Sequence, residues 1–110
     1  MPDTDTPVLE TLTLMTAASL DNSDLSPREL MIARVAALVA VDAPAASYAF
    51  NIAPATDAGL TLDDAEDILV AVAPIVGTAR VASAVMNLAA GLGLAIALAE
   101  DEDDGATVCG

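Results

Sequence analysis

The stretch LSPRELMIARVAALVAV, residues 25–41, decides the fold because a helix start signal leads directly into a long apolar run. Ser26 is suited to the N-cap, Pro27 to the first helical position, and Glu29 to the reciprocal bond of a capping box. Arg34 is the only charge within the run that follows. The pattern predicts a helix from about residue 27 to residue 41.

A further helix is predicted over about 7–19, on the N-terminal side of this stretch. Val8, Leu12 and Met15 recur at i, i+4 and i+7, which places them on one face of a helix. The segment LDNSDL, residues 20–25, breaks the pattern and separates the two helices.

On the C-terminal side, a helix is predicted beyond Asp42, which is suited to cap it. Pro44 is tolerated in the first turn, and Gly59 is a natural residue to end the helix. Pro54 is expected to kink this helix or to end it early, because proline lacks the amide hydrogen that a helix interior uses.

Two more helices are predicted in the remaining sequence. Thr61, with Asp64 three residues later, is suited to cap a helix that runs to Gly77. Thr78 is suited to start the last helix. Residues 81–99 of that helix contain no charge, so the run is long enough to cross a bilayer.

We favour a place in a protein core or an oligomer for this last helix over a membrane span. It is rich in alanine and glycine, only Arg80 is basic nearby, and no aromatic residue marks a membrane interface. Ser83, Asn87 and Gly91 form a narrow stripe of small and polar side chains, which suits a close approach between two helices.

Length and composition predict one all-α domain that buries further surface by self-association. The chain has 110 residues, of which 55% are hydrophobic but only 2% aromatic. A domain of this size buries roughly two thirds of the surface of its unfolded chain, so the apolar excess indicates contacts between subunits. We expect a bundle of about five helices over 7–100, with disordered ends at 1–6 and 101–110.

The charged residues exclude several classes of function. Seventeen acids against three arginines and no lysine give a net charge of −14, and such a surface suits neither nucleic acid nor an anionic membrane. Without histidine, the usual general base and the commonest metal ligand are missing. The single Cys109 makes no intramolecular disulfide, and the acidic N-terminus is unlike a signal peptide. We therefore expect a cytoplasmic protein without metal or cofactor.

Ser47, Tyr48 and Asn51 place the only tyrosine of the chain on a polar helix face. Two interpretations are open. In the first, Ser47 and Asn51 supply the hydrogen-bond partner that a buried tyrosine needs. In the second, the three residues line a small ligand pocket, in which Tyr48 donates a proton or a hydrogen bond to an oxyanion.

The arginines also allow two roles. Arg28 is expected to be exposed, whereas Arg34 and Arg80 lie within or beside apolar segments, where an arginine is tolerated only when paired. Each of these two either clamps a substrate carboxylate or forms an ion pair with an acid, of which the candidates are Asp42, Asp64 and Asp67.

Two acidic features have ordinary structural explanations beside a functional one. Glu29 either completes its capping box or turns inward as a catalytic acid. The run DDAED, residues 63–67, is better explained as a helix start that faces water than as a metal site, because the oxygen-rich loop of a calcium site is absent.

Taken together, LSPRELMIARVAALVAV and NIAPATDAGLTLDDAEDILVAVAPIVGTARVASAV resemble the carboxymuconolactone decarboxylase family, which includes the alkylhydroperoxidase D-like proteins. The resemblance covers about residues 25–99. It rests on the SPREL helix start, the AGLT turn into an acidic helix start, and the VGTARVASAV entry to the last helix. It implies an all-helical subunit that assembles into trimers or hexamers.

Redox members of that family carry CxxCxxxH on the helix before the AGLT turn. Counted back from Gly59, these positions fall on Pro44, Ser47 and Asn51. Counted forward from Glu29, they fall instead on Val41, Pro44 and Tyr48. Neither count meets a cysteine or a histidine, so the resemblance does not extend to thiol peroxidase chemistry. The histidine that the decarboxylase branch uses is missing as well.

Two hypotheses of function are open at this point. The first is a non-redox enzyme of lyase, decarboxylase or isomerase type, or a binder of a small organic acid. The second is a non-catalytic, homo-oligomeric structural protein. The site expected for the first has the catalytic residues Tyr48, Asn51 and Glu29 and the substrate-binding residues Ser47, Arg80, Arg34 and Asn87.

Overall fold

Five α-helices in the predicted order make up the computed structural model, which describes the backbone of residues 6–109 and the side chains as far as residue 100. No strand occurs in this range, and the predicted all-α class is confirmed. The helices are α1 (Thr6–Asn22), α2 (Pro27–Ala40), α3 (Ala45–Asp57), α4 (Leu62–Val76) and α5 (Thr78–Cys109).

Two of the helices begin with reciprocal side-chain bonds. At the start of α2, the Ser26 N–H donates to Glu29 Oε1 (2.9 Å) and the Glu29 N–H donates to Ser26 Oγ (3.1 Å). At the start of α4, the Thr61 N–H donates to Asp64 Oδ2 (2.8 Å) and the Asp64 N–H donates to Thr61 Oγ1 (3.2 Å). Each pair satisfies amide hydrogens that no helical carbonyl reaches. The predicted caps of both helices are therefore confirmed.

The predicted helix ends are also marked by glycine. Gly59 and Gly77 follow α3 and α4, each with a φ of +88°, which is backbone that favours glycine. α3 continues past Pro54 to Asp57, so the proline lies within its last turn. After Gly59 the chain continues into α4, which packs against α2 and α5.

Asp42 does not cap α3, contrary to the prediction. The N-cap is Pro44, which makes no side-chain cap bond. Asp42 lies in the α2–α3 loop with a left-handed φ of +56°, and its Oδ1 accepts a hydrogen bond from Ser83 Oγ (2.6 Å). The carboxylate is therefore engaged with α5 and not with the first turn of α3.

The chain ends differ from the predicted boundaries. α5 runs to Cys109 and not to about residue 100, so the helix continues through the acidic segment that was expected to be disordered. Extending an existing helix adds one hydrogen bond per residue without the cost of a new nucleus. α1 begins at Thr6, and residues 1–5 of the predicted N-terminal segment lie outside the described residues.

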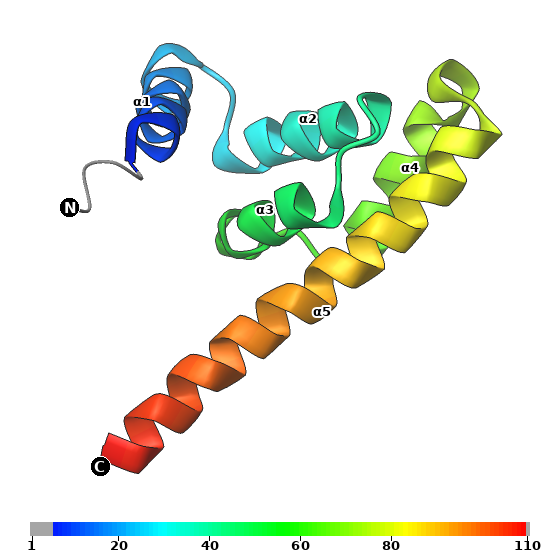
Figure 1. The fold of residues 1–110 in the computed structure, drawn as a ribbon. Coiled ribbons are helices and arrows are strands. Elements are labelled where there is room, and N and C mark those ends of the chain that lie inside the picture. Colours follow the sequence, from blue (N-terminus) through cyan, green and yellow to red (C-terminus); the bar gives the residue numbers. More distant parts are fainter. Residues whose placement is uncertain (1–5, 110) are drawn as a thin grey trace.

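Helices α2 to α5 form the bundle (Figure 1). α3 lies against α5, while α2 packs on both α3 and α4. A small core joins the α2–α3 region to α5 through Val39, Ala43, Tyr48 and Ala84. The side chains of Ala43 and Ala84 are small, so the helices can approach closely at this point. The core there is correspondingly small.

α3 and α5 approach each other closely at Gly91. A Cβ atom at this position would lie 2.7 Å from the Ala45 carbonyl oxygen and 2.8 Å from Tyr48 Cβ. Only a residue without a side chain fits there. The predicted role of the Ser83–Asn87–Gly91 stripe in close helix approach is thus confirmed at Gly91.

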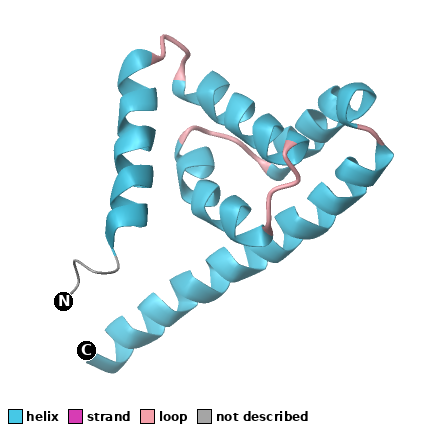
Figure 2. Ribbon diagram, turned by 45° about the horizontal axis from the view of Figure 1, so that its top comes forward, coloured by secondary structure: helices cyan, strands magenta, loops and turns pink. Residues whose placement is uncertain are grey.

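α1 stands apart from the bundle. Among the described residues it packs against no other helix and has no buried residue, and Figures 1 and 2 both show it beside the bundle. The far half of α5 also extends beyond its neighbours. The radius of gyration, 15.6 Å, accordingly exceeds the roughly 13 Å expected for a compact chain of this length.

Much of the large apolar surface is therefore uncovered. Phe50 is 76% exposed and Ile75 is 87% exposed, and most of the large side chains of α1 are more than half exposed. Within the described residues, one segment of α5, Thr78–Glu100, has the length and hydropathy of a membrane-crossing helix, a test that core helices of soluble proteins also pass. Residues 6–100 of the single chain leave these faces without cover.

Candidate ligand cavity

A cavity of about 220 Å³ lies between α2, α3, α4 and α5. Its wall is almost entirely aliphatic, and none of its residues is charged. The lining comprises Val35, Leu38, Tyr48, Asn51, Ile52, Ala55, Thr56, Leu60, Thr61, Leu62, Ala65, Ile68, Leu88 and Leu92. This is the form of a small-molecule site, with an apolar wall and a few polar groups.

The helical period of α3 explains how one helix supplies so much of this wall. Tyr48, Asn51, Ile52 and Ala55 are spaced at i, i+3, i+4 and i+7, so they share one face. The Gly91 contact holds that face against α5. The local sequence places the residues on one side of α3, and the bundle then places that side on the cavity.

Tyr48 is the most deeply buried of the predicted site residues. It is only 2% exposed, yet its hydroxyl is shielded from solvent and has no hydrogen-bond partner among the described residues. Burial, followed by the charge of Asp42, raises its pKa above the ordinary value. The interpretation in which Ser47 and Asn51 satisfy this hydroxyl is therefore wrong. Tyr48 lines the cavity, and its hydroxyl is closed off from solvent.

Asn51 and Ser47 are connected through the helix and not through the tyrosine. Asn51 Nδ2 donates to the Ser47 carbonyl oxygen (2.8 Å), one turn earlier in α3. Asn51 also lines the cavity, whereas Ser47 does not. Of the predicted trio, the structure thus brings Tyr48 and Asn51 to the cavity.

The arginines lie away from the cavity, so the predicted anion clamp is not formed in the subunit. Arg80 is exposed in the first turn of α5. Arg34 Nη2 donates to Ser19 Oγ of α1 (3.0 Å), and neither arginine is ion-paired within the described residues. The predicted pairing of Arg34 or Arg80 with Asp42, Asp64 or Asp67 is therefore wrong as well.

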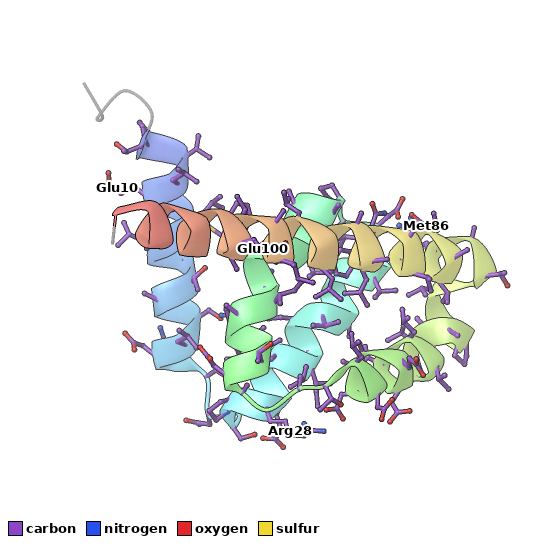
Figure 3. All side chains as sticks on the ribbon, turned by 90° about the horizontal axis from the view of Figure 1, so that it is seen from below. Glu10, Arg28, Met86 and Glu100 are labelled. Carbon is purple, nitrogen blue, oxygen red and sulfur yellow. The ribbon has the colours of Figure 1, made fainter. Side chains whose placement is uncertain are left out.

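Arg28 makes the ion pair that was expected of the other arginines. At the start of α2 (Figure 3), its guanidinium binds Asp64 with both ends, Nη2 to Oδ1 at 2.7 Å and Nη1 to Oδ2 at 3.1 Å. Nη1 also donates to the Gly59 carbonyl oxygen (3.2 Å). The Arg28 bond, assisted by the Thr61 N–H, holds the pKa of Asp64 well below its ordinary value. The bridge ties α2 to the first turn of α4, and the Gly59 bond ties α2 to the α3–α4 turn.

Glu29 and Asn87 have structural partners outside the cavity. The Ser26 N–H bond keeps the pKa of Glu29 below its ordinary value, so this carboxylate is a cap facing solvent. Asn87 Nδ2 donates to the Ser83 carbonyl oxygen (3.1 Å) and to Ser83 Oγ (3.2 Å). Asn87, Ser83 and Asp42 together form a polar chain from the α2–α3 loop to α5. This chain was not predicted from the sequence, because Asp42 and Ser83 are 41 residues apart.

The cavity brings together no pair of groups that would work as acid and base. Apart from the shielded Tyr48 hydroxyl, the lining residues with amide or hydroxyl groups are Asn51, Thr56 and Thr61, and the Thr61 hydroxyl is engaged by Asp64. Among the described residues, no group of three or more acidic or cysteine side chains is arranged to hold a metal ion. The arrangement is suited to binding.

Comparisons of the chain with protein-family models, with curated proteins and with solved structures found no match.

Proposed function

We propose that this chain is a carboxymuconolactone decarboxylase-like subunit without thiol redox chemistry, and that it binds a small uncharged organic molecule in the cavity between α2 and α5. The observation that carries the proposal is the uncharged, largely aliphatic wall of a 220 Å³ space. An enclosed apolar cavity of about 150 Å³ in one engineered protein takes up benzene. A cavity larger by half suits a substituted ring or an aliphatic molecule of similar bulk.

An uncharged ligand is favoured over the organic acid that the arginines suggested. A carboxylate buried without a cation costs several kcal/mol, and the cavity wall carries no cation. The net charge of −14 also repels an approaching anion. A ketone, an alcohol or an aromatic hydrocarbon is uncharged, so its binding involves neither burial of a charge nor repulsion by the acidic chain.

Binding is favoured over catalysis for a related reason. General acid–base catalysis needs a titrating group within reach of the ligand, and the cavity offers amide, hydroxyl and aliphatic groups. Glu29 is engaged at a helix start, and the Tyr48 hydroxyl is shielded with a raised pKa.

The test is a titration of the full chain with acetophenone and with benzoate, which share a ring but differ in charge. Methyl signals of the cavity leucines and isoleucines, followed by NMR, report binding. We expect acetophenone to shift these signals at millimolar concentration and benzoate to leave them unchanged. Binding of benzoate as tight as that of acetophenone would overturn the uncharged-ligand proposal.

A matched pair of variants in α3 tests whether the ligand binds in the cavity. Ala55→Leu puts bulk into the cavity, whereas Ala53→Leu adds the same bulk at an exposed position two residues earlier. We expect Ala55→Leu to abolish the acetophenone shifts and Ala53→Leu to preserve them. Equal effects of the two variants would place the ligand elsewhere.

The second candidate function is a non-catalytic, homo-oligomeric structural protein. Exposed aliphatic side chains on α1 and α5 favour it, since contacts between copies would cover them. The proposed assembly is the trimer or hexamer that the family resemblance implies, and the proposed location is the cytoplasm. A chain that assembles but leaves acetophenone unbound would favour this candidate over the first.

A further inference from the structure

An apolar groove of about 380 Å³ lies between α4 and α5, beside the ligand cavity. Four residues line both spaces: Leu62, Ala65, Leu88 and Leu92. Because the same residues border both, at most a single layer of side chains separates the groove from the cavity. Leu62 is 63% exposed, and an exposed side chain changes its rotamer within nanoseconds. This layer can therefore open without a change in the helices, and one molecule can occupy both spaces.

The groove follows α4 and α5 from the shared residues toward the turn that joins the two helices. Leu62 and Leu92 are equally far from Gly77 along the chain, as are Leu69 and Val85, so the two helices contribute matching stretches to the lining. From Leu62 to Leu69, α4 rises by about 10 Å. An extended chain advances by about 1.2 Å per bond, so the groove has the length of a tail of about eight bonds.

The side chains that can bond a neutral polar group are at the cavity end. Asn51 and Thr56 line the cavity and not the groove. Of the described residues along the groove, the polar one is Glu66, which is exposed. Its carboxylate and the net charge of −14 disfavour an anionic end group, such as that of a fatty acid. A ligand that fills both spaces would therefore place a neutral polar group in the cavity and an apolar chain in the groove.

We propose that the ligand is a neutral ketone or alcohol with an extended aliphatic tail, whose polar end lies in the cavity and whose tail lies in the α4–α5 groove. The inference rests on the proposed function, because the cavity holds the polar end. The tail passes between the two helices beside Ala65, the smallest of the four shared side chains. A chain of methylene groups suits this place better than a fused ring system, because it is narrow and flexible.

The length of the tail sets the expected gain in affinity. Full burial of one methylene group strengthens binding about fourfold. The groove is open to solvent at Glu66, Val85 and Ala89, which are exposed, so the tail is covered on one side. We therefore expect about a twofold gain per methylene group, which is roughly 15-fold for four of them.

The first test titrates the full chain with acetophenone and with hexanophenone, which share the ring and the carbonyl group but differ by four methylene groups. Methyl signals of Leu69 and Val85, followed by NMR, report the groove, because neither residue lines the cavity. We expect hexanophenone to bind roughly 15-fold more tightly and to shift these signals, and acetophenone to leave them unchanged. Equal affinities, or groove signals that hexanophenone does not move, would overturn the inference. Groove signals that respond to protein dilution and not to hexanophenone would also overturn it, because a second copy would then occupy the groove.

A matched pair of variants in α5 distinguishes binding in the groove from the general hydrophobicity of the longer ketone. Ala89 lines the groove, whereas Ala90 lines neither space, and both are exposed. A carboxylate at position 89 would lose water to the tail, which disfavours binding. We expect Ala89→Glu to reduce the affinity for hexanophenone to that for acetophenone, and Ala90→Glu to retain the difference. Equal effects of the two substitutions would contradict a tail in the groove.

The two ketones also separate this inference from the proposed function. If acetophenone shifts the cavity signals and the longer tail adds no affinity, the tail is wrong and the small-ligand proposal stands. If neither ketone shifts the cavity signals, the proposed function is wrong, and the inference is wrong with it.

Discussion

Gly91→Ala, compared with Gly93→Ala, tests the close contact between α3 and α5 that shapes the cavity. A methyl group at position 91 would lie 2.7 Å from the Ala45 carbonyl oxygen, 2.8 Å from Tyr48 Cβ and 3.1 Å from the Ala49 nitrogen. At position 93 the same group meets nothing within 4 Å. The two glycines are two residues apart on one helix, so they differ in surroundings and not in chemistry.

The expected energies have opposite signs. Non-bonded carbon atoms sit about 3.5–4.0 Å apart, and the atoms that crowd position 91 belong to the backbone and a Cβ, which do not rotate away. α3 and α5 must therefore separate by roughly 1 Å, a strain that costs typically 1–3 kcal/mol in a packed core. Alanine regains about 1 kcal/mol of helix propensity over glycine. Gly91→Ala should lose up to about 2 kcal/mol on balance, and Gly93→Ala should gain up to about 1 kcal/mol.

Urea unfolding, followed by circular dichroism at one protein concentration, measures both variants. Equal slopes with shifted midpoints would report stability alone. In thermal melts, a loss of about 2 kcal/mol corresponds to a fall of roughly 10 °C in the midpoint for a domain of this size. A Gly91→Ala protein as stable as Gly93→Ala would refute the close α3–α5 contact, and with it this wall of the cavity.

Three further predictions concern the polar groups. Tyr48→Phe should leave stability unchanged or raise it by about 1 kcal/mol, because the hydroxyl is buried without a partner among residues 6–100; a clear loss in urea unfolding would show that the hydroxyl is bonded. Ser83→Ala should lower stability by about 1 kcal/mol through loss of the 2.6 Å bond to Asp42, whereas Ser83→Thr, which keeps a hydroxyl, should lose less. The pKa of Asp64 is lower in the folded than in the unfolded chain, so its contribution to stability is complete above pH about 4 and declines as the pH falls below that value. We expect Arg28→Ala to lower stability at pH 7 and to weaken the loss of stability on acidification. An unchanged dependence of stability on pH would contradict the role of the Arg28–Asp64 bridge.

Helix positions followed from signals a few residues long. The boxes at Ser26–Glu29 and Thr61–Asp64 join residues three apart, and Gly59 and Gly77 act through their own φ. Such signals are complete within one turn of chain, so they are readable without knowledge of the fold. The Tyr48–Asn51 face of α3 was found in the same way, from spacing alone.

The partners of the charged and polar groups were not predictable in this way. Arg28 and Asp64 are 36 residues apart, and Asp42 and Ser83 are 41 apart. Several acids compete for each arginine in this sequence, and only the distances in the folded bundle decide between them. Arg34, which bonds Ser19, and Tyr48, whose hydroxyl has no partner in the part of the chain that the structure describes, show the same limit.

By itself, the sequence determined five helices and an apolar excess larger than one small domain can bury, because periodicity, caps and composition are local or additive properties. The tertiary structure alone decided that Tyr48 and Asn51 meet a cavity, that the arginines do not, and that α1 remains uncovered. Those outcomes depend on how closely the helices approach. That approach is set at contacts such as Gly91 against α3, between residues far apart in the chain.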